Sequence, residues 1–92
     1  MKRDLDKETE YFCRAILAIE TLDECRAFLE DVCTIKEINS IEQRLTVAKL
    51  LREGRTFNEI VESTGASTAT ISRVNRCLTY GTGYKSILNK LN

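Results

Sequence analysis

Proline, histidine and tryptophan are absent from the 92-residue sequence, and glycine occurs only four times. Because proline would break a helix, its absence leaves glycine and the capping residues as the main signals that end helices. The glycines stand where helices are expected to end, at Gly54, Gly65, Gly81 and Gly83. The sequence therefore predicts an all-α fold.

The lack of histidine also limits the chemistry of the chain. Histidine is the usual general base, and the sequence has no P-loop, no G-x-S-x-G and no paired-carboxylate arrangement. The cysteines Cys13, Cys25, Cys33 and Cys77 are separated by 12, 8 and 44 residues, unlike the close pairs of a zinc site. We therefore expect no enzyme activity, no metal and no cofactor. The thiols of Cys13, Cys25 and Cys33 are expected mainly to pack in helices.

Long hydrophobic runs are absent too. No apolar stretch approaches the roughly 20 residues of a membrane span, and the N-terminal MKRDLDKETE is too charged for a secretory signal. We expect one soluble, cytoplasmic domain over residues 1–92. With 42% hydrophobic residues the chain can form a core, but a chain this short buries only about two thirds of its unfolded surface. Oligomerisation would therefore stabilise it.

The most informative segment is TFNEIVESTGASTATISRVNRCL, Thr56 to Leu78, which has the spacing of a helix-turn-helix within residues 56–79. Thr56 and Glu59 form a T-x-x-E capping box that opens a short helix, and Gly65 ends this helix where a left-handed backbone is needed. Ser67 is a good N-cap for a second helix from Thr68 to about Thr79.

One side of this second helix is apolar. Ile71, Val74 and Leu78 recur at helical spacing and are expected to face the first helix. Together with Ile60, Thr64 and Ala66 they would form a small core that fixes the angle between the two helices.

The opposite side carries small polar residues near the N-terminus, followed by two cations: Thr68, Ala69, Ser72, Arg73 and Arg76. Short side chains let a helix end approach base edges in the major groove, and arginine can bind phosphate or guanine. A plain helical hairpin with a solvated polar face is the structural alternative. We favour contact with double-stranded DNA.

Charge is unevenly placed, although the net charge is zero. Residues 1–54 hold nine Lys or Arg against twelve Asp or Glu, a net −3, whereas residues 55–92 hold five against two, a net +3. This pattern fits an acidic assembly region joined to a basic DNA-binding region, but it also lies within chance fluctuation for a chain with 30% charged residues.

Further helices are expected on either side of this motif. In the N-terminal part we place them at Asp4–Glu20, Leu22–Cys33 and Ile35–Glu53, the last two opened by capping boxes Thr21/Glu24 and Thr34/Glu37. The run Ala15–Ile19 is apolar throughout, which suggests burial between subunits. The long third helix carries an apolar stripe, with Ile38, Ile41, Leu45, Ala48 and Leu50 or Leu51. A last short helix is expected at 84–92, closing the bundle or the partner subunit.

This order of about six helices resembles the Trp repressor superfamily, most closely its YerC/YecD branch, over nearly the whole chain. The similarity is carried by LLREG at Leu50–Gly54 and by GASTATISRVNRCL at Gly65–Leu78. The resemblance implies an intertwined homodimer built from residues 1–54, which reads a palindromic operator. It also implies DNA contacts along the recognition helix, at Thr68, Ala69, Thr70, Ser72 and Arg73.

The sequence departs from the tryptophan-binding members of that family at the effector pocket. One of their two arginines is present as Arg73, but the glycine that follows it is replaced by Val74, and a serine that holds the ligand's amino group aligns with Cys77. The other arginine aligns with Gln43, next to Arg44. These departures argue against tryptophan as corepressor and leave any other small-molecule effector open.

We therefore expect a homodimeric, sequence-specific DNA-binding transcriptional regulator of the repressor type. A helical protein-protein interaction module without DNA binding is the alternative. Tyr80 and Tyr84 could supply anchors for such a partner or pack beneath the last helix. The small polar side of Thr68, Ala69 and Ser72 lacks the large side chains that dominate protein interfaces.

Overall fold

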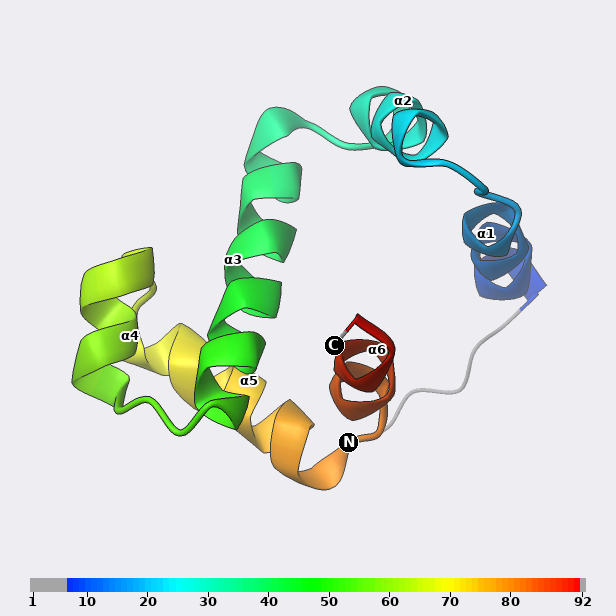
Figure 1. The fold of residues 1–92 in the computed structure, drawn as a ribbon. Coiled ribbons are helices and arrows are strands. Elements are labelled where there is room, and N and C mark those ends of the chain that lie inside the picture. Colours follow the sequence, from blue (N-terminus) through cyan, green and yellow to red (C-terminus); the bar gives the residue numbers. More distant parts are fainter. Residues whose placement is uncertain (1–6, 92) are drawn as a thin grey trace. The chain divides into compact units, whose positions relative to one another are not determined.

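Six α-helices follow one another along residues 7–91, which are the residues that the computed structural model describes (Figure 1). Their bounds are α1 Lys7–Leu17, α2 Leu22–Val32, α3 Ile35–Arg52, α4 Phe57–Thr64, α5 Thr68–Tyr80 and α6 Gly83–Leu91. Within this range there is no strand, so the all-α prediction is confirmed. The chain divides into two units, residues 1–35 and 36–92, which we describe one at a time.

In the first unit α1 is shorter than expected. Residues 4–6 of the predicted helix lie outside the described residues, and its predicted end at Glu20 is wrong, because α1 ends at Leu17. The Ala18 N–H bonds to the carbonyls of both Arg14 and Ala15, and the Ile19 N–H bonds to the carbonyl of Ile16, which tightens the last turn. The run Ala15–Ile19 therefore does not form one helical face.

The reason for this early end lies in how α2 begins. Thr21 has an extended backbone and its side chain accepts a hydrogen bond from the Glu24 N–H at 3.0 Å, as an N-cap does. The Glu24 carboxylate accepts a hydrogen bond from the Glu20 N–H at 2.8 Å, whereas the predicted capping box requires it to accept from the Thr21 N–H. Only the Thr21 half of the predicted capping box is therefore formed. The hydrogen bond to Glu24 holds Glu20 outside α1. At its other end α2 stops at Val32, one residue early, with Cys33 as the C-cap.

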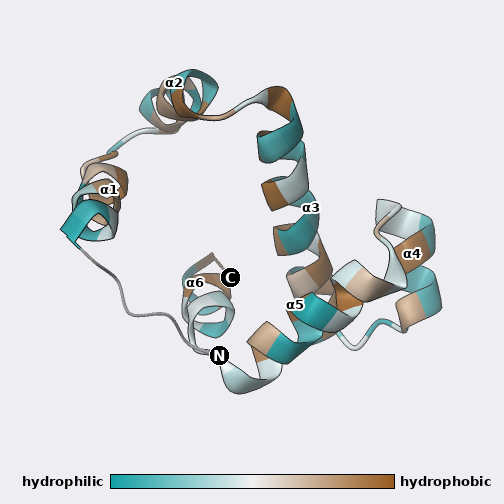
Figure 2. Cartoon of the chain, turned by 180° about the vertical axis from the view of Figure 1, so that it is seen from behind, coloured by the Kyte–Doolittle hydropathy of each residue, from teal (hydrophilic) through white to brown (hydrophobic). Residues whose placement is uncertain are grey.

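Neither α1 nor α2 buries a single residue. Hydrophobic residues are nevertheless prominent on both helices (Figure 2). The large apolar side chains that remain exposed on them are Tyr11, Phe12, Ile16, Leu17, Leu22, Leu29 and Val32. An isolated helix of 11 residues is marginal in water. These helices consequently depend on packing for their stability.

The second unit holds the core. Its buried apolar residues come from α3, α4, the α4–α5 turn, α5 and α6: Val47, Ala48, Ile60, Ala66, Ile71, Val74, Leu78 and Leu88. The predicted stripe on α3 is only partly right. Ala48 is buried, but Ile41 and Leu45 are 48% and 37% exposed, and the buried neighbour Val47 was missed. Only the C-terminal half of α3 contributes buried residues, where α5 crosses it (Figures 1 and 2).

Glycine positions in this unit agree with the prediction in three of four cases. Gly54 and Gly65 have left-handed backbones, with φ of 85° and 74°, and Gly81 is the C-cap of α5. Gly83 does not end a helix but begins α6, so the prediction at this position was wrong. Among the described helices, none combines the length and the hydropathy that a bilayer span requires.

Candidate nucleic-acid interface

Helix α4, which precedes α5, begins with the predicted capping box. The Thr56 side chain accepts from the Glu59 N–H at 3.2 Å, and the Glu59 carboxylate accepts from the Thr56 N–H at 2.9 Å. Both halves of the reciprocal arrangement are present. The box satisfies backbone donors that the first turn of a helix leaves without partners.

The turn between α4 and α5 is tightly hydrogen-bonded. Gly65 adopts φ 74° and ψ 5°, and its N–H bonds to the Val61 carbonyl. The Thr64 hydroxyl donates to the Ile60 carbonyl at 2.7 Å and accepts from the Ala66 N–H at 3.1 Å. Ser67 then caps α5 by accepting from the Thr70 N–H at 3.1 Å. The predicted turn and N-cap are therefore confirmed.

The inner side of α5 is fixed by packing. Ile71 is fully buried, Val74 is 2% exposed and Leu78 is 8% exposed, and Ile60 of α4 and Ala66 of the turn belong to the same cluster. Burying one such aliphatic side chain contributes about 1.5–3 kcal/mol. Because the buried residues define one side of α5, they also determine which side faces outward.

The outer face of α5 consists of five exposed residues, Thr68, Ala69, Ser72, Arg73 and Arg76. At about 100° per residue, these positions lie on the side of the helix opposite Ile71, Val74 and Leu78. Thr70 differs from the other predicted contacts. It is half-buried, and its hydroxyl accepts a hydrogen bond from the Ser67 hydroxyl at 3.1 Å. Thr70 therefore lies at the edge of this face.

The outer face of α5 is positively charged and has no competing anion of its own. Among the described residues the two ion pairs are Arg14–Glu10 and Arg26–Asp23, which belong to α1 and α2. The guanidinium groups of Arg73 and Arg76 pair with none of the described residues. The first turn of α5 contains no acidic residue. This arrangement can accept an anionic ligand along the helix.

Four of the five predicted effector-pocket residues come together. Arg44, Arg73, Val74 and Cys77 line a cavity of about 190 Å³, together with Tyr84. Gln43 does not line this cavity, because its side-chain amide donates instead to the Thr64 carbonyl at 3.2 Å. The arginine of α3 that lies beside Arg73 is thus Arg44, one residue further along the helix. The buried Val74 occupies one wall.

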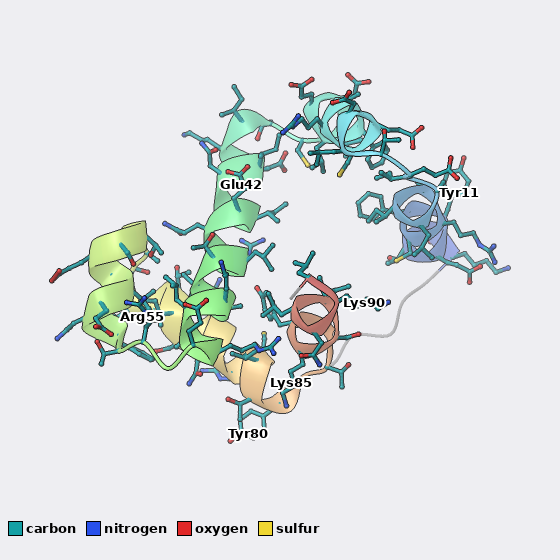
Figure 3. All side chains as sticks on the ribbon, in the orientation of Figure 1. Tyr11, Glu42, Arg55, Tyr80, Lys85 and Lys90 are labelled. Atoms are coloured by element: carbon teal, nitrogen blue, oxygen red, sulfur yellow. The ribbon has the colours of Figure 1, made fainter. Side chains whose placement is uncertain are left out.

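A second, larger cavity was not foreseen from the sequence. It measures about 490 Å³ and is lined by Leu45, Cys77, Gly81, Gly83, Tyr84 and Ile87. Tyr84 lines both cavities. In the sequence, the feature that could have pointed to the larger cavity is the position of Tyr84 directly after Gly81 and Gly83. Tyr80, by contrast, is 84% exposed and projects from the end of α5 (Figure 3).

The capped α4, the left-handed turn at Gly65 and the polar outer face of α5 define a helix-turn-helix protein. Residues 7–92 match the family model described as Trp repressor protein, so the chain belongs to the Trp repressor family, a family of DNA-binding regulators. The resemblance noted in the sequence is confirmed.

Similar proteins support this membership. The chain is 51% identical over 86 residues to YerC of Bacillus subtilis (strain 168), itself an uncharacterised protein, covering 92% of this chain and 83% of YerC. A TrpR-like protein from Eubacterium eligens ATCC 27750 has a TM-score of 0.89 and 55% identity, covering 94% of this chain and 90% of that one. A putative Trp repressor from Staphylococcus aureus has a TM-score of 0.90 and 44% identity, covering 96% and 89%.

Proposed function

We propose that this protein is a sequence-specific transcriptional regulator that binds a palindromic operator as a homodimer and represses by occluding polymerase. The observation that carries the proposal is the outer face of α5, which is exposed, polar and cationic while the other side is locked into the core. Two such helices roughly 34 Å apart would enter successive major grooves.

The order of side chains along α5 suits a major groove. Thr68, Ala69 and Ser72 are short, so the N-terminal turn of α5 can approach the base edges closely. Arg73 and Arg76 follow further along, where a guanidinium group can bind phosphate or pair with guanine. Thr70, at the edge of the face, would contact DNA only if its bond to Ser67 rearranged.

The exposed apolar surface of the N-terminal helices supports the proposed homodimer. Since α1 and α2 bury none of their residues, a second copy that covers Phe12 and Ile16 would supply the missing core. A dimer would also double the number of phosphate contacts, which matters because residues 55–92 carry a net charge of only +3. The proposed DNA ligand implies a cytoplasmic location.

Tryptophan is a poor candidate for a corepressor. The cavity beside Arg44 and Arg73 has a volume of about 190 Å³, and the buried Val74 forms part of its wall where the tryptophan-binding relatives carry glycine. Cys77 stands where those relatives carry a serine for the ligand's amino group. We propose regulation without a ligand, or with a small molecule other than tryptophan.

The proposed binding face is tested by alanine variants. Arg73→Ala and Arg76→Ala should each weaken binding to a duplex selected from a random pool by about ten-fold or more, because each removes a phosphate or guanine contact. Lys90→Ala removes the same charge from α6 and serves as the matched control. Unchanged affinity in both arginine variants would eliminate the outer face of α5 as the DNA-binding surface.

The proposed dimer has its own test. Ile16→Glu places a charge on the apolar side of α1 and should give a monomer in sedimentation, with loss of duplex binding. Arg14→Glu is the control, because Arg14 lies on the other side of α1 and the substitution replaces an exposed ion pair with Glu10 by an exposed like-charge pair, a small effect at the surface. A variant at Ile16 that still sediments as a dimer would contradict the proposed assembly.

A protein-interaction module is the competing function, favoured by the strongly exposed Tyr80. Salt dependence separates the two. Binding of a duplex should weaken steeply as salt rises, with a slope set by the phosphates contacted, whereas an apolar docking site should respond little. A partner that binds equally well at low and high salt would favour the interaction module.

A further inference from the structure

Gln43 connects the scaffold helix α3 to the joint of the helix-turn-helix. Its Nε2 atom donates a hydrogen bond of 3.2 Å to the carbonyl of Thr64, 21 residues further along the chain. The hydrogen bond is partly buried, and both residues belong to the second structural unit. Gln43 is thereby turned away from the cavity that contains Arg44 and Arg73.

The accepting group lies at a critical point of the motif. Thr64 is the last residue of α4, where carbonyl groups have no partner within the helix. Its hydroxyl is already engaged with the Ile60 carbonyl and the Ala66 N–H. Of these three hydrogen bonds at Thr64, the one from Gln43 comes from a helix outside the motif.

Packing alone does not explain this connection. The apolar core that includes Val47, Ile60 and Ile71 holds the helices together, but apolar contacts have little directional preference. A hydrogen bond, in contrast, favours a narrow range of distance and angle. The bond from Gln43 fixes the end of α4 against α3 immediately before the left-handed Gly65, and so constrains the direction in which α5 leaves the turn.

We infer that Gln43 is a positioning residue for DNA recognition, which sets the orientation of α5 by holding the Thr64 carbonyl. The inference rests on the proposed DNA binding. A misdirected α5 would lose base contacts more readily than phosphate contacts, because base readout depends on close geometric fit. Loss of the hydrogen bond should therefore reduce sequence selectivity more than general affinity for DNA.

The surroundings of Gln43 offer a matched control. A polar groove of about 400 Å³ is lined by Asn39, Glu42, Gln43, Thr46, Ser63 and Thr64. Asn39 lies one helical turn before Gln43, is exposed, and makes no side-chain hydrogen bond with any described residue. Asn39→Asp therefore introduces the same change of charge as Gln43→Glu in the same groove without touching the bond to Thr64.

The test compares binding of the full-length variants to a selected duplex and to a scrambled duplex by fluorescence anisotropy. Gln43→Glu leaves only acceptors and Gln43→Met removes all polar atoms at similar size, whereas Gln43→Lys restores a donor. We expect the first two to lower the ratio of selected to scrambled affinity about five-fold, the size of one lost hydrogen bond. Gln43→Lys should recover most of the ratio, and Asn39→Asp should leave it unchanged.

A second measurement does not depend on DNA. Amide hydrogen exchange at Gly65 and Ala66 should be about five-fold faster in Gln43→Met than in the wild type or Asn39→Asp, because the turn loses its anchor. Equal exchange, or an unchanged selectivity ratio in both donor-free variants, would overturn the inference even if the wild type binds DNA. A wild type that binds no duplex while Gln43→Met still accelerates exchange would overturn the proposed function and reduce Gln43 to a structural role.

Discussion

Gly65 offers the sharpest test of the turn between α4 and α5, through the substitution Gly65→Ala. The backbone at this position has φ 74° and ψ 5°, which an L-residue adopts only at a cost of about 1–2 kcal/mol. An added Cβ atom would meet nothing within 4 Å, so no steric clash contributes. The whole effect of the substitution therefore comes from backbone conformation.

The expected magnitude follows from two opposing terms. Alanine disfavours the left-handed backbone of the folded state, which lowers the stability. It also reduces the conformational freedom of the unfolded chain, which raises the stability by about 0.4–1 kcal/mol. The net loss in the free energy of unfolding should be about 1 kcal/mol, or a fall in Tm of about 4–8 °C for a domain of this size. Gly65→Asn should lose less, because asparagine tolerates left-handed backbones better than alanine.

The assay is urea unfolding followed by circular dichroism, with all variants at one protomer concentration because a dimer's stability depends on it. Gly81→Ala is a comparison variant whose destabilisation would have a different cause. The backbone φ of Gly81 is −98°, which alanine adopts readily, but the added Cβ would lie 2.7 Å from the Cys77 carbonyl oxygen. If Gly65→Ala is as stable as the wild type, or more stable than Gly65→Asn, the left-handed backbone at this turn is refuted.

Three other predictions concern the core, the cap and the cavity. Ile71→Ala should lower the free energy of unfolding, measured by urea unfolding, by about 2–5 kcal/mol, because the side chain is fully buried. A clearly smaller loss would contradict the tight packing of Ile71 in the core. Ser67→Ala should cost about 1 kcal/mol by removing the acceptor for the Thr70 N–H, and an unchanged midpoint would contradict that cap. Millimolar tryptophan should not raise the Tm of the wild type, since the buried Val74 forms part of the wall of the cavity beside Arg73, and a clear rise would restore tryptophan as a candidate effector.

The helix-turn-helix was predictable because its signals are local. Capping at Thr56 and Ser67 and the left-handed turn at Gly65 depend on residues within one turn of each other, and the structure agrees with all three. The inner side of α5 was equally clear, since Ile71, Val74 and Leu78 recur at helical spacing and no other side of the helix is apolar.

The errors arose where two local signals competed or where tertiary contacts decided. At the end of α1, apolar residues favoured a longer helix, but the Glu24 carboxylate captures the Glu20 N–H and the helix stops at Leu17. The side chain of Gln43 gave no indication that it reaches Thr64, because that contact joins residues 21 positions apart. Gly83 was assigned to a helix end from its residue type alone, although a first helical position also tolerates glycine.

The outer face of α5 is the surface that we propose reads a DNA sequence. The most direct test of this proposal is selection of duplexes from a random pool by the purified wild type at about 150 mM salt, where weak nonspecific binding is suppressed. The wild type should recover a palindrome with half-sites about one helical turn apart, and the variant that lacks both Arg73 and Arg76 should lose that enrichment. Recovery of no sequence above background, or of the same palindrome by the double variant, would contradict the proposal.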